Sequence, residues 1–278
     1  MRWSIRTLSA VAVATLASLG GCSRSYPQNT PEALIASAQQ MVHDGRAARL
    51  TDLIYAEDER SRAIYHRIGI MLDHLQGLAS QIQTAFPDEI EQLRQDAQAA
   101  AEAGESSNLL GRLTQARTAA RRGRSRDQQS EVLDRTIRQL LADPYAFLRS
   151  GEDFLGVNTI ADDMAVLTWD GQMVLPPLGV LLREVDGKWF LVLPTNLPLV
   201  SRLMPQNDDE FKILASLIKI FDNAIVDVTE DVKTGDAGSL EDAARLTGEK
   251  LVAPALFAFF AFGKAIQARE AEIQSDSG

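Results

Sequence analysis

The 278-residue chain is poor in the residues that build disulfides, metal sites and catalytic centres. It contains one cysteine, which excludes an internal disulfide, and three histidines, none of them in an HExxH spacing. It also lacks the glycine-bracketed serine of hydrolases and the glycine-rich loop that holds phosphates. We therefore predict no catalytic residue from a motif, no metal site and no cofactor.

Positive charge and aromatic residues are also scarce. The chain has 28 basic against 38 acidic side chains, a formal net charge of −10, and its aromatic content is 6%. Such an acidic chain lacks the basic footprint of nucleic-acid-binding proteins, so we predict no nucleic-acid partner. Hydrophobic residues, at 45%, supply enough material for a core, and abundant alanine, leucine and glutamine favour helices.

The apolar stretch near the N-terminus is too short for an ordinary membrane span. Residues 8–19 are largely apolar and follow Arg2 and Arg6, whereas a span needs about 20 residues. A basic start followed by a short apolar stretch is typical of a secretory signal. The stretch ends in LGGC at Cys22, the only cysteine of the chain. This ending closely resembles the lipobox of bacterial lipoproteins, in which a cysteine follows the small pair.

The resemblance implies a lipid-anchored protein of the bacterial cell envelope. It implies that residues 1–21 are removed as a signal peptide and that Cys22, lipidated on its sulfur, attaches the chain to the membrane. Ser23 in the next position implies, by the sorting rule of this family, the outer membrane facing the periplasm. Two or more acyl chains anchor stably because each buried CH₂ contributes about 0.8 kcal/mol. The alternative is an ordinary secretory signal with an incidental cysteine.

Two Asp-Gly pairs organise the middle of the chain. Asp170-Gly171 and Asp186-Gly187 each lie between runs of strand-forming residues within residues 157–194. Asp-Gly in this setting indicates a hairpin, because a type I′ turn needs positive φ at both central residues. We expect three or four antiparallel strands, at 163–169, 172–175, 178–185 and 188–194.

Helical patterns surround this sheet. Thr30 before Pro31 is typical of a helix start, and so is Asn207 with Glu210 three residues later. A heptad pattern on one face marks a long helix within residues 57–86, formed by Ile64, Ile68, Met71, Leu75, Leu78, Ile82 and Ala85. This face favours an intramolecular bundle with the helices that follow it, and the alternative is a coiled coil with a partner.

The predicted fold class is α+β, a small antiparallel sheet covered by helices, with an inserted helical bundle and a C-terminal helical pair. The predicted divisions are a signal peptide at 1–21, a tether at 22–29, a sheet domain at 30–56 and 144–206, a helical insertion at 57–143, C-terminal helices at 207–270 and a polar tail at 271–278.

The C-terminal region contains the most apolar segment of the predicted helices. Residues 251–262 read LVAPALFAFFAF, and 12 residues are too few to cross a membrane. Phe257, Phe259, Phe260 and Phe262 are distributed all around the helix, which indicates contact on more than one face. We expect the sheet and the helix at 208–231 to bury this segment. If they do not, these phenylalanines form a surface for a protein partner or for lipid.

Two further stretches resemble nuclear-transport-factor-2-like domains. Residues 30–54, TPEALIASAQQMVHDGRAARLTDLI, resemble their opening helices, and residues 179–194, GVLLREVDGKWFLVLP, resemble their final hairpin. The resemblance implies a cone-shaped pocket, in a family of isomerases, dehydratases and non-catalytic binding modules. A long helical segment between the two stretches and a helical extension after them depart from the family pattern.

Three residues are predicted for such a pocket. Asp163 would act as a general base there, and Trp169 and Trp189 come from neighbouring strands. Their alternative roles are strand entry for Asp163 and sheet core for the tryptophans. The leading function is a non-enzymatic, lipid-anchored envelope protein that binds a protein partner or a small apolar ligand. The alternatives are a cone-fold enzyme that uses Asp163 and a structural helper in envelope assembly.

Overall fold

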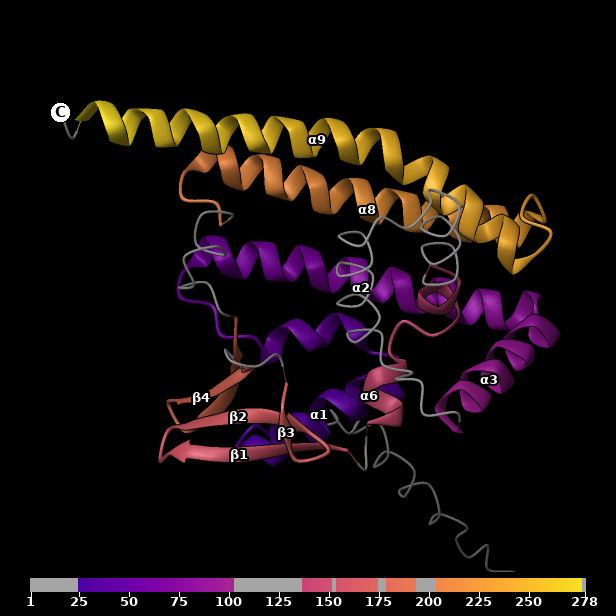
Figure 1. The fold of residues 1–278 in the computed structure, drawn as a ribbon, viewed down its shortest axis with the longest axis horizontal. Coiled ribbons are helices and arrows are strands. Elements are labelled where there is room, and N and C mark those ends of the chain that lie inside the picture. The colour runs from indigo at the N-terminus through magenta and orange to yellow at the C-terminus, as the bar shows by residue number, and fades with distance from the viewer. Residues whose placement is uncertain (1–24, 103–136, 152–153, 175–178, 194–203, 277–278) are drawn as a thin grey trace, which may run out of the picture.

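The computed structural model describes residues 25–102, 137–151, 154–174, 179–193 and 204–276 (Figure 1). It confirms the α+β class, because an antiparallel sheet lies at one side of a stack of long helices. The signal peptide, Cys22, and residues 103–136 of the predicted insertion lie outside the described residues.

The sheet contains one strand more than the sequence indicated. Its strands are β1 (Leu155–Ala161), β2 (Met164–Trp169), β3 (Gln172–Met173), β4 (Leu181–Val185) and β5 (Lys188–Val192). The order is β1-β2-β4-β5, all antiparallel, and β3 pairs with β2. Strand β1 was not predicted, because it contains Gly156 and Asn158, two residue types that strands disfavour, and because its second half is exposed.

Both Asp-Gly pairs form the predicted turns. The φ angles are 49° at Asp170 and 71° at Gly171, and 52° at Asp186 and 73° at Gly187. Positive φ at both central residues is the signature of a type I′ turn, whose twist matches that of the flanking strands. The turns therefore set the register of the β2-β3 and β4-β5 hairpins.

Replacing Gly187 by valine is expected to lower the free energy of unfolding by about 1–3 kcal/mol. An added Cβ at Gly187 meets no atom within 4 Å, so the loss comes from the backbone conformation and not from a clash. Urea denaturation followed by circular dichroism measures it. The control is Gly77→Ala, since Gly77 also has open space around it but lies inside a helix, where alanine is the better residue. Equal stability of the two variants would contradict the turn assignment.

Two short helices cover the sheet near the start of the described chain. They are α1 (Pro31–His43), capped by Thr30 as predicted, and the 3₁₀ helix η1 (Ala47–Leu53). Their apolar residues join those of the sheet in one core cluster: Leu34, Met41, Leu53, Ala165, Leu182 and Trp189.

The last residues of the predicted tether are bound to this layer. The Trp189 N–H donates to the Gln28 carbonyl at 2.6 Å, and the Gln28 side chain donates back to the Trp189 carbonyl at 3.0 Å. The Tyr26 hydroxyl donates to Asp44 at 3.0 Å. The chain is therefore fixed to the domain from Tyr26 onward.

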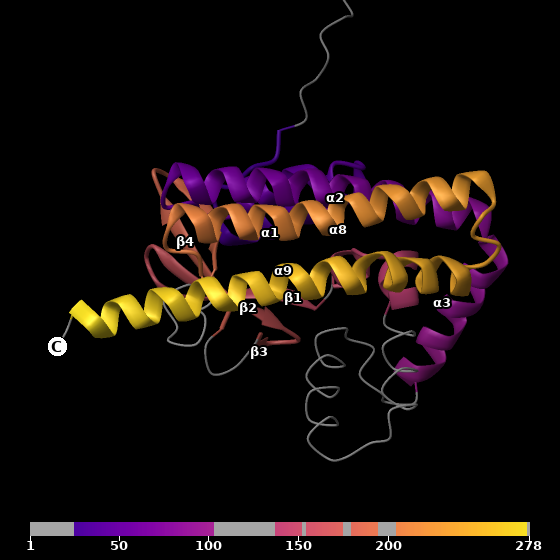
Figure 2. The same cartoon turned by 90° about the horizontal axis from the view of Figure 1, so that it is seen from above.

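The long helices stack on the other side of η1. They are α2 (Glu59–Ala85), α8 (Asp208–Thr234) and α9 (Leu240–Asp276), with α3 (Pro87–Glu102) and α6 (Ala146–Ser150) beside them (Figures 1 and 2). Helix α2 contacts η1 and α8, and α8 contacts α9. The stack therefore runs from α1 through η1, α2 and α8 to α9. Helix α9 continues six residues beyond the boundary at 270 that the sequence predicted.

The heptad face of α2 packs inside the molecule, and its main neighbour is α8. Leu78 and Ile82 are fully buried in a cluster with Val228 of α8 and Leu240 of α9. On the same side, the Asp222 carboxylate of α8 lies 2.6 Å from Nδ1 of His74. The heptad face therefore packs within the chain, and the helix that covers most of it belongs to the C-terminal pair and is not one of the helices that directly follow α2.

Candidate functional site

The structure does not gather the three predicted pocket residues into one site. Asp163 is exposed in the turn before β2, where its carbonyl accepts from the Glu184 N–H at 2.9 Å. Trp169 lies at the opposite end of β2, stacked on Phe154 with 5.7 Å between ring centroids. Trp189 is buried in the core between the sheet and α1. The tryptophans therefore have packing roles.

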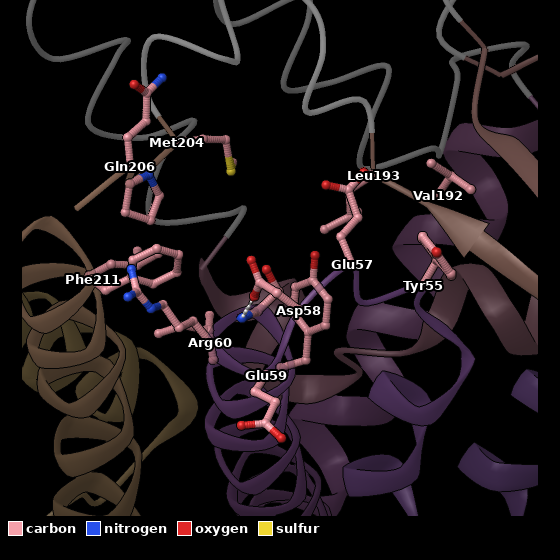
Figure 3. Close-up of a pocket in the computed structure, with 15 residues that line it drawn as sticks. Tyr55, Glu57, Asp58, Glu59, Arg60, Val192, Leu193, Met204, Gln206 and Phe211 are labelled. Carbon is pink, nitrogen blue, oxygen red and sulfur yellow. Dashed lines mark hydrogen bonds between the residues drawn. The ribbon is translucent and has the colours of Figure 1, made fainter. Parts of the chain in front are cut away.

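A concavity of about 630 Å³ lies elsewhere, where the N-terminal ends of α2 and α8 meet the end of β5 (Figure 3). Asp58 caps α2 by accepting from the Ser61 N–H at 2.7 Å, and this backbone hydrogen bond lowers the pKa of the carboxyl. Arg60 pairs with Asp208 at 2.9 Å and stands 5.9 Å from the ring of Phe211.

The chemistry of this concavity is limited. Glu57, Asp58 and Glu59 give it an acidic edge, and Arg60 is the one basic residue among those described as lining it. The carboxylate of Asp58 and the guanidinium of Arg60 are engaged in a helix cap and an ion pair. The described lining contains neither a histidine nor a cysteine, and its serine, Ser61, is hydrogen-bonded to Asp58 in the first turn of α2.

Two ion pairs fix the apolar part of α9 on α8. Lys250 pairs with Asp231, and Arg269 pairs with Glu210 at 2.5 Å. Glu210 is fully buried in the first turn of α8, where it also accepts from the Gln206 N–H at 2.8 Å. The two pairs enclose residues 251–268, whose only charged side chain is Lys264. Helix α9 is therefore held along its length, with one side against α8.

The opposite side of α9 presents large apolar side chains. The exposed fractions are 64% for Leu256, 76% for Phe257, 55% for Phe259 and 65% for Phe260, and we call these four residues the aromatic surface. Phe262 is buried. The prediction that 251–262 is buried is therefore wrong for these four residues. The reason is geometric: α9 lies at the end of the stack farthest from the sheet (Figure 1), and among the described elements α8 is its main neighbour.

The helical geometry explains how four neighbouring residues share one face. At about 100° per residue, Phe259, Leu256, Phe260 and Phe257 follow one another over an arc of roughly 160°. The buried Ala255 and Phe262 fall on the other side, toward α8. Lys264 lies within the same arc one turn beyond Phe260, with its ammonium 4.9 Å from the ring of Phe260. The aromatic surface is therefore continuous, with charge at its edge.

Comparison with known proteins assigns neither a family nor a function, because no family model, curated protein or solved structure matches the chain. Within the described residues, the segment Leu240–Arg269 is long and apolar enough to cross a membrane by length and composition, and little of its most apolar window is buried. The same residues that pass this test form the aromatic surface and the side of α9 that packs on α8.

Proposed function

We propose that this chain is a lipid-anchored protein of the bacterial cell envelope, without catalytic activity, that binds another protein through the aromatic surface of α9. The observation that carries the binding role is the exposure of Leu256, Phe257, Phe259 and Phe260 on a helix that ion pairs hold in place. Contiguous exposed apolar side chains with charged residues at the edge are typical of interaction surfaces.

The anchoring role is supported by the sequence around Cys22. The short apolar stretch, the small pair and the single cysteine of the chain occur in the order that lipidation requires. Anchoring through acyl chains leaves the folded domain outside the bilayer, where α9 can meet another protein. Localisation at the outer membrane, facing the periplasm, follows from Ser23 by the family's sorting rule.

Replacing Cys22 by serine is expected to move the protein from the membrane fraction to the soluble fraction. Without the thiol no acyl chain is attached, so the hydrophobic contribution of the lipid is lost. Fractionation of bacteria expressing the full chain, followed by immunoblotting, measures the distribution. Ser23→Ala is the matched control, since it changes the adjacent residue and keeps the cysteine. Full membrane retention of Cys22→Ser would show that lipidation is not the anchor.

A further inference from the structure

We propose that the aromatic surface binds the same surface of a second copy of this chain, with the two α9 helices antiparallel about a two-fold axis near position 258. This inference rests on the binding role proposed above and is independent of lipidation. In a two-fold interface each residue i of one copy faces a residue j of the other, and j of the first faces i of the second.

The apolar residues of the surface are symmetric about this position. Leu256 and Phe260 lie two residues before and after position 258, and Phe257 and Phe259 lie one residue before and after it. In an antiparallel pair, Leu256 of one copy therefore faces Phe260 of the other. Phe257 and Phe259 lie on opposite flanks of the arc, and each approaches its own counterpart in the other copy. Each large side chain meets another large apolar side chain, and none faces a charge.

Two charged residues that flank the surface are complementary in the same arrangement. Glu249 and Lys264 are exposed and lie nine residues before position 258 and six residues after it. At about 100° per residue, both fall within the arc of the aromatic surface. An antiparallel pair places Glu249 of one copy opposite Gln267 of the other. Because Gln267 lies within one helical turn of Lys264, Glu249 of one copy comes near Lys264 of the other at both ends of the interface. A parallel pair would place each of these charges against its own copy, and contacts between like charges are unfavourable.

The exposed area is large enough for such a pair. At about 200 Å² for a large side chain, the four exposed fractions add up to roughly 500 Å² per copy. Two copies can therefore bury up to roughly 1,000 Å² from these residues alone, about the minimum for a specific interface. Exposed Ala253 falls within the same arc and adds to this area.

A bilayer that held a lipidated Cys22 would not be a suitable occupant of the surface. Because Gln28 is bound to β5 and Tyr26 to Asp44, Cys22 lies four residues before the first bound side chain, a distance of at most about 14 Å. The start of the described chain lies with α1, on the side of α2 and α8 away from α9 (Figures 1 and 2). The start of the described chain is therefore two helix layers, at about 8–10 Å each, away from α9.

Sedimentation equilibrium of residues 23–278, which contain every described element, tests the proposal without detergent. The unaltered sequence is expected to form a dimer at micromolar concentration, and Phe257→Asp is expected to weaken dimerisation at least a hundredfold. Ile160→Asp on β1 is the control, because Ile160 is an exposed apolar residue away from α9. If Phe257→Asp alters the circular dichroism spectrum, Phe257→Ala takes its place, with an expected loss of at least tenfold. A monomeric wild type, or a dimer that both Phe257 variants leave intact, would overturn the proposal.

Charge reversal tests the antiparallel arrangement. Glu249→Lys and Lys264→Glu are each expected to weaken self-association roughly tenfold, since each places like charges together at both ends. An equimolar mixture of the two variants is expected to form a heterodimer of wild-type affinity, because the opposite charges then face each other again. Failure of the mixture to recover affinity would overturn the antiparallel pairing.

Two further outcomes separate this proposal from the others. The proposal would be overturned if residues 23–278 required detergent, or if they bound stably to phosphatidylethanolamine vesicles and did not dimerise. Either result would make α9 a lipid-binding helix. The fractionation of Cys22→Ser reports on anchoring alone. If Cys22→Ser stays at the membrane, the anchoring proposal fails, but dimerisation of residues 23–278 is unaffected. The two results are therefore distinguishable.

Discussion

Replacing Arg269 by methionine is expected to lower the free energy of unfolding by about 3–5 kcal/mol, as the removal of one partner from a buried ion pair does. Glu210 has no solvent exposure, and the side chain of Arg269 is 11% exposed. The Arg269 guanidinium donates to the Oε2 atom of Glu210, and Oε1 has no hydrogen-bond partner among the described residues. Without Arg269, the carboxylate keeps one backbone donor, from Gln206, and little other compensation for its burial.

Arg245→Met provides the matched control for this measurement. Arg245 lies on the same helix and forms two ion pairs, with Asp242 and Glu249, but its side chain is 54% exposed. Exposed pairs contribute about 0–1 kcal/mol, so this variant is expected to lose little stability. Urea denaturation of both variants gives the comparison. If Arg269→Met lowered the free energy of unfolding no more than Arg245→Met does, the buried pair would not hold α9 on α8.

Local rules predicted the ends of helices and the tight turns correctly. Thr30 accepts from the Ala33 N–H at 3.1 Å, and Asn207 accepts from the Glu210 N–H at 2.9 Å, as helix caps do. The two Asp-Gly turns have the predicted φ angles. These features depend on residues at most three positions apart, so the sequence contains all the information that they need.

Pairings between distant parts of the chain were not predictable in the same way. The heptad face of α2 showed that a helix would cover it, but periodicity does not identify that helix, which proved to be α8. Glu210 was recognised as a capping residue, yet its ion-pair partner Arg269 lies 59 positions away. Phenylalanines on all sides of α9 showed that the helix needs contacts. They could not show that α8 covers only one side of it.

The position of the N-terminus in the proposed dimer leads to a prediction about membranes. The start of the described chain lies on α1 and β5, on the far side of the molecule from α9. When two copies pair through α9, their N-termini therefore leave the dimer on opposite faces. The dimer therefore presents its two N-termini to two apposed surfaces.

An N-terminal hexahistidine tag can attach residues 23–278 to vesicles that contain a chelating lipid. The attached protein is expected to cluster these vesicles, which dynamic light scattering measures as a several-fold rise in particle size. The pairs form between vesicles because each anchor is on the outer face of its dimer. Phe257→Asp is expected to abolish clustering and Ile160→Asp to leave it unchanged. Excess untagged protein should reverse it, since an untagged copy occupies the aromatic surface without adding a second anchor. A protein that dimerises in solution but leaves vesicles dispersed would contradict the placement of the N-termini on opposite faces.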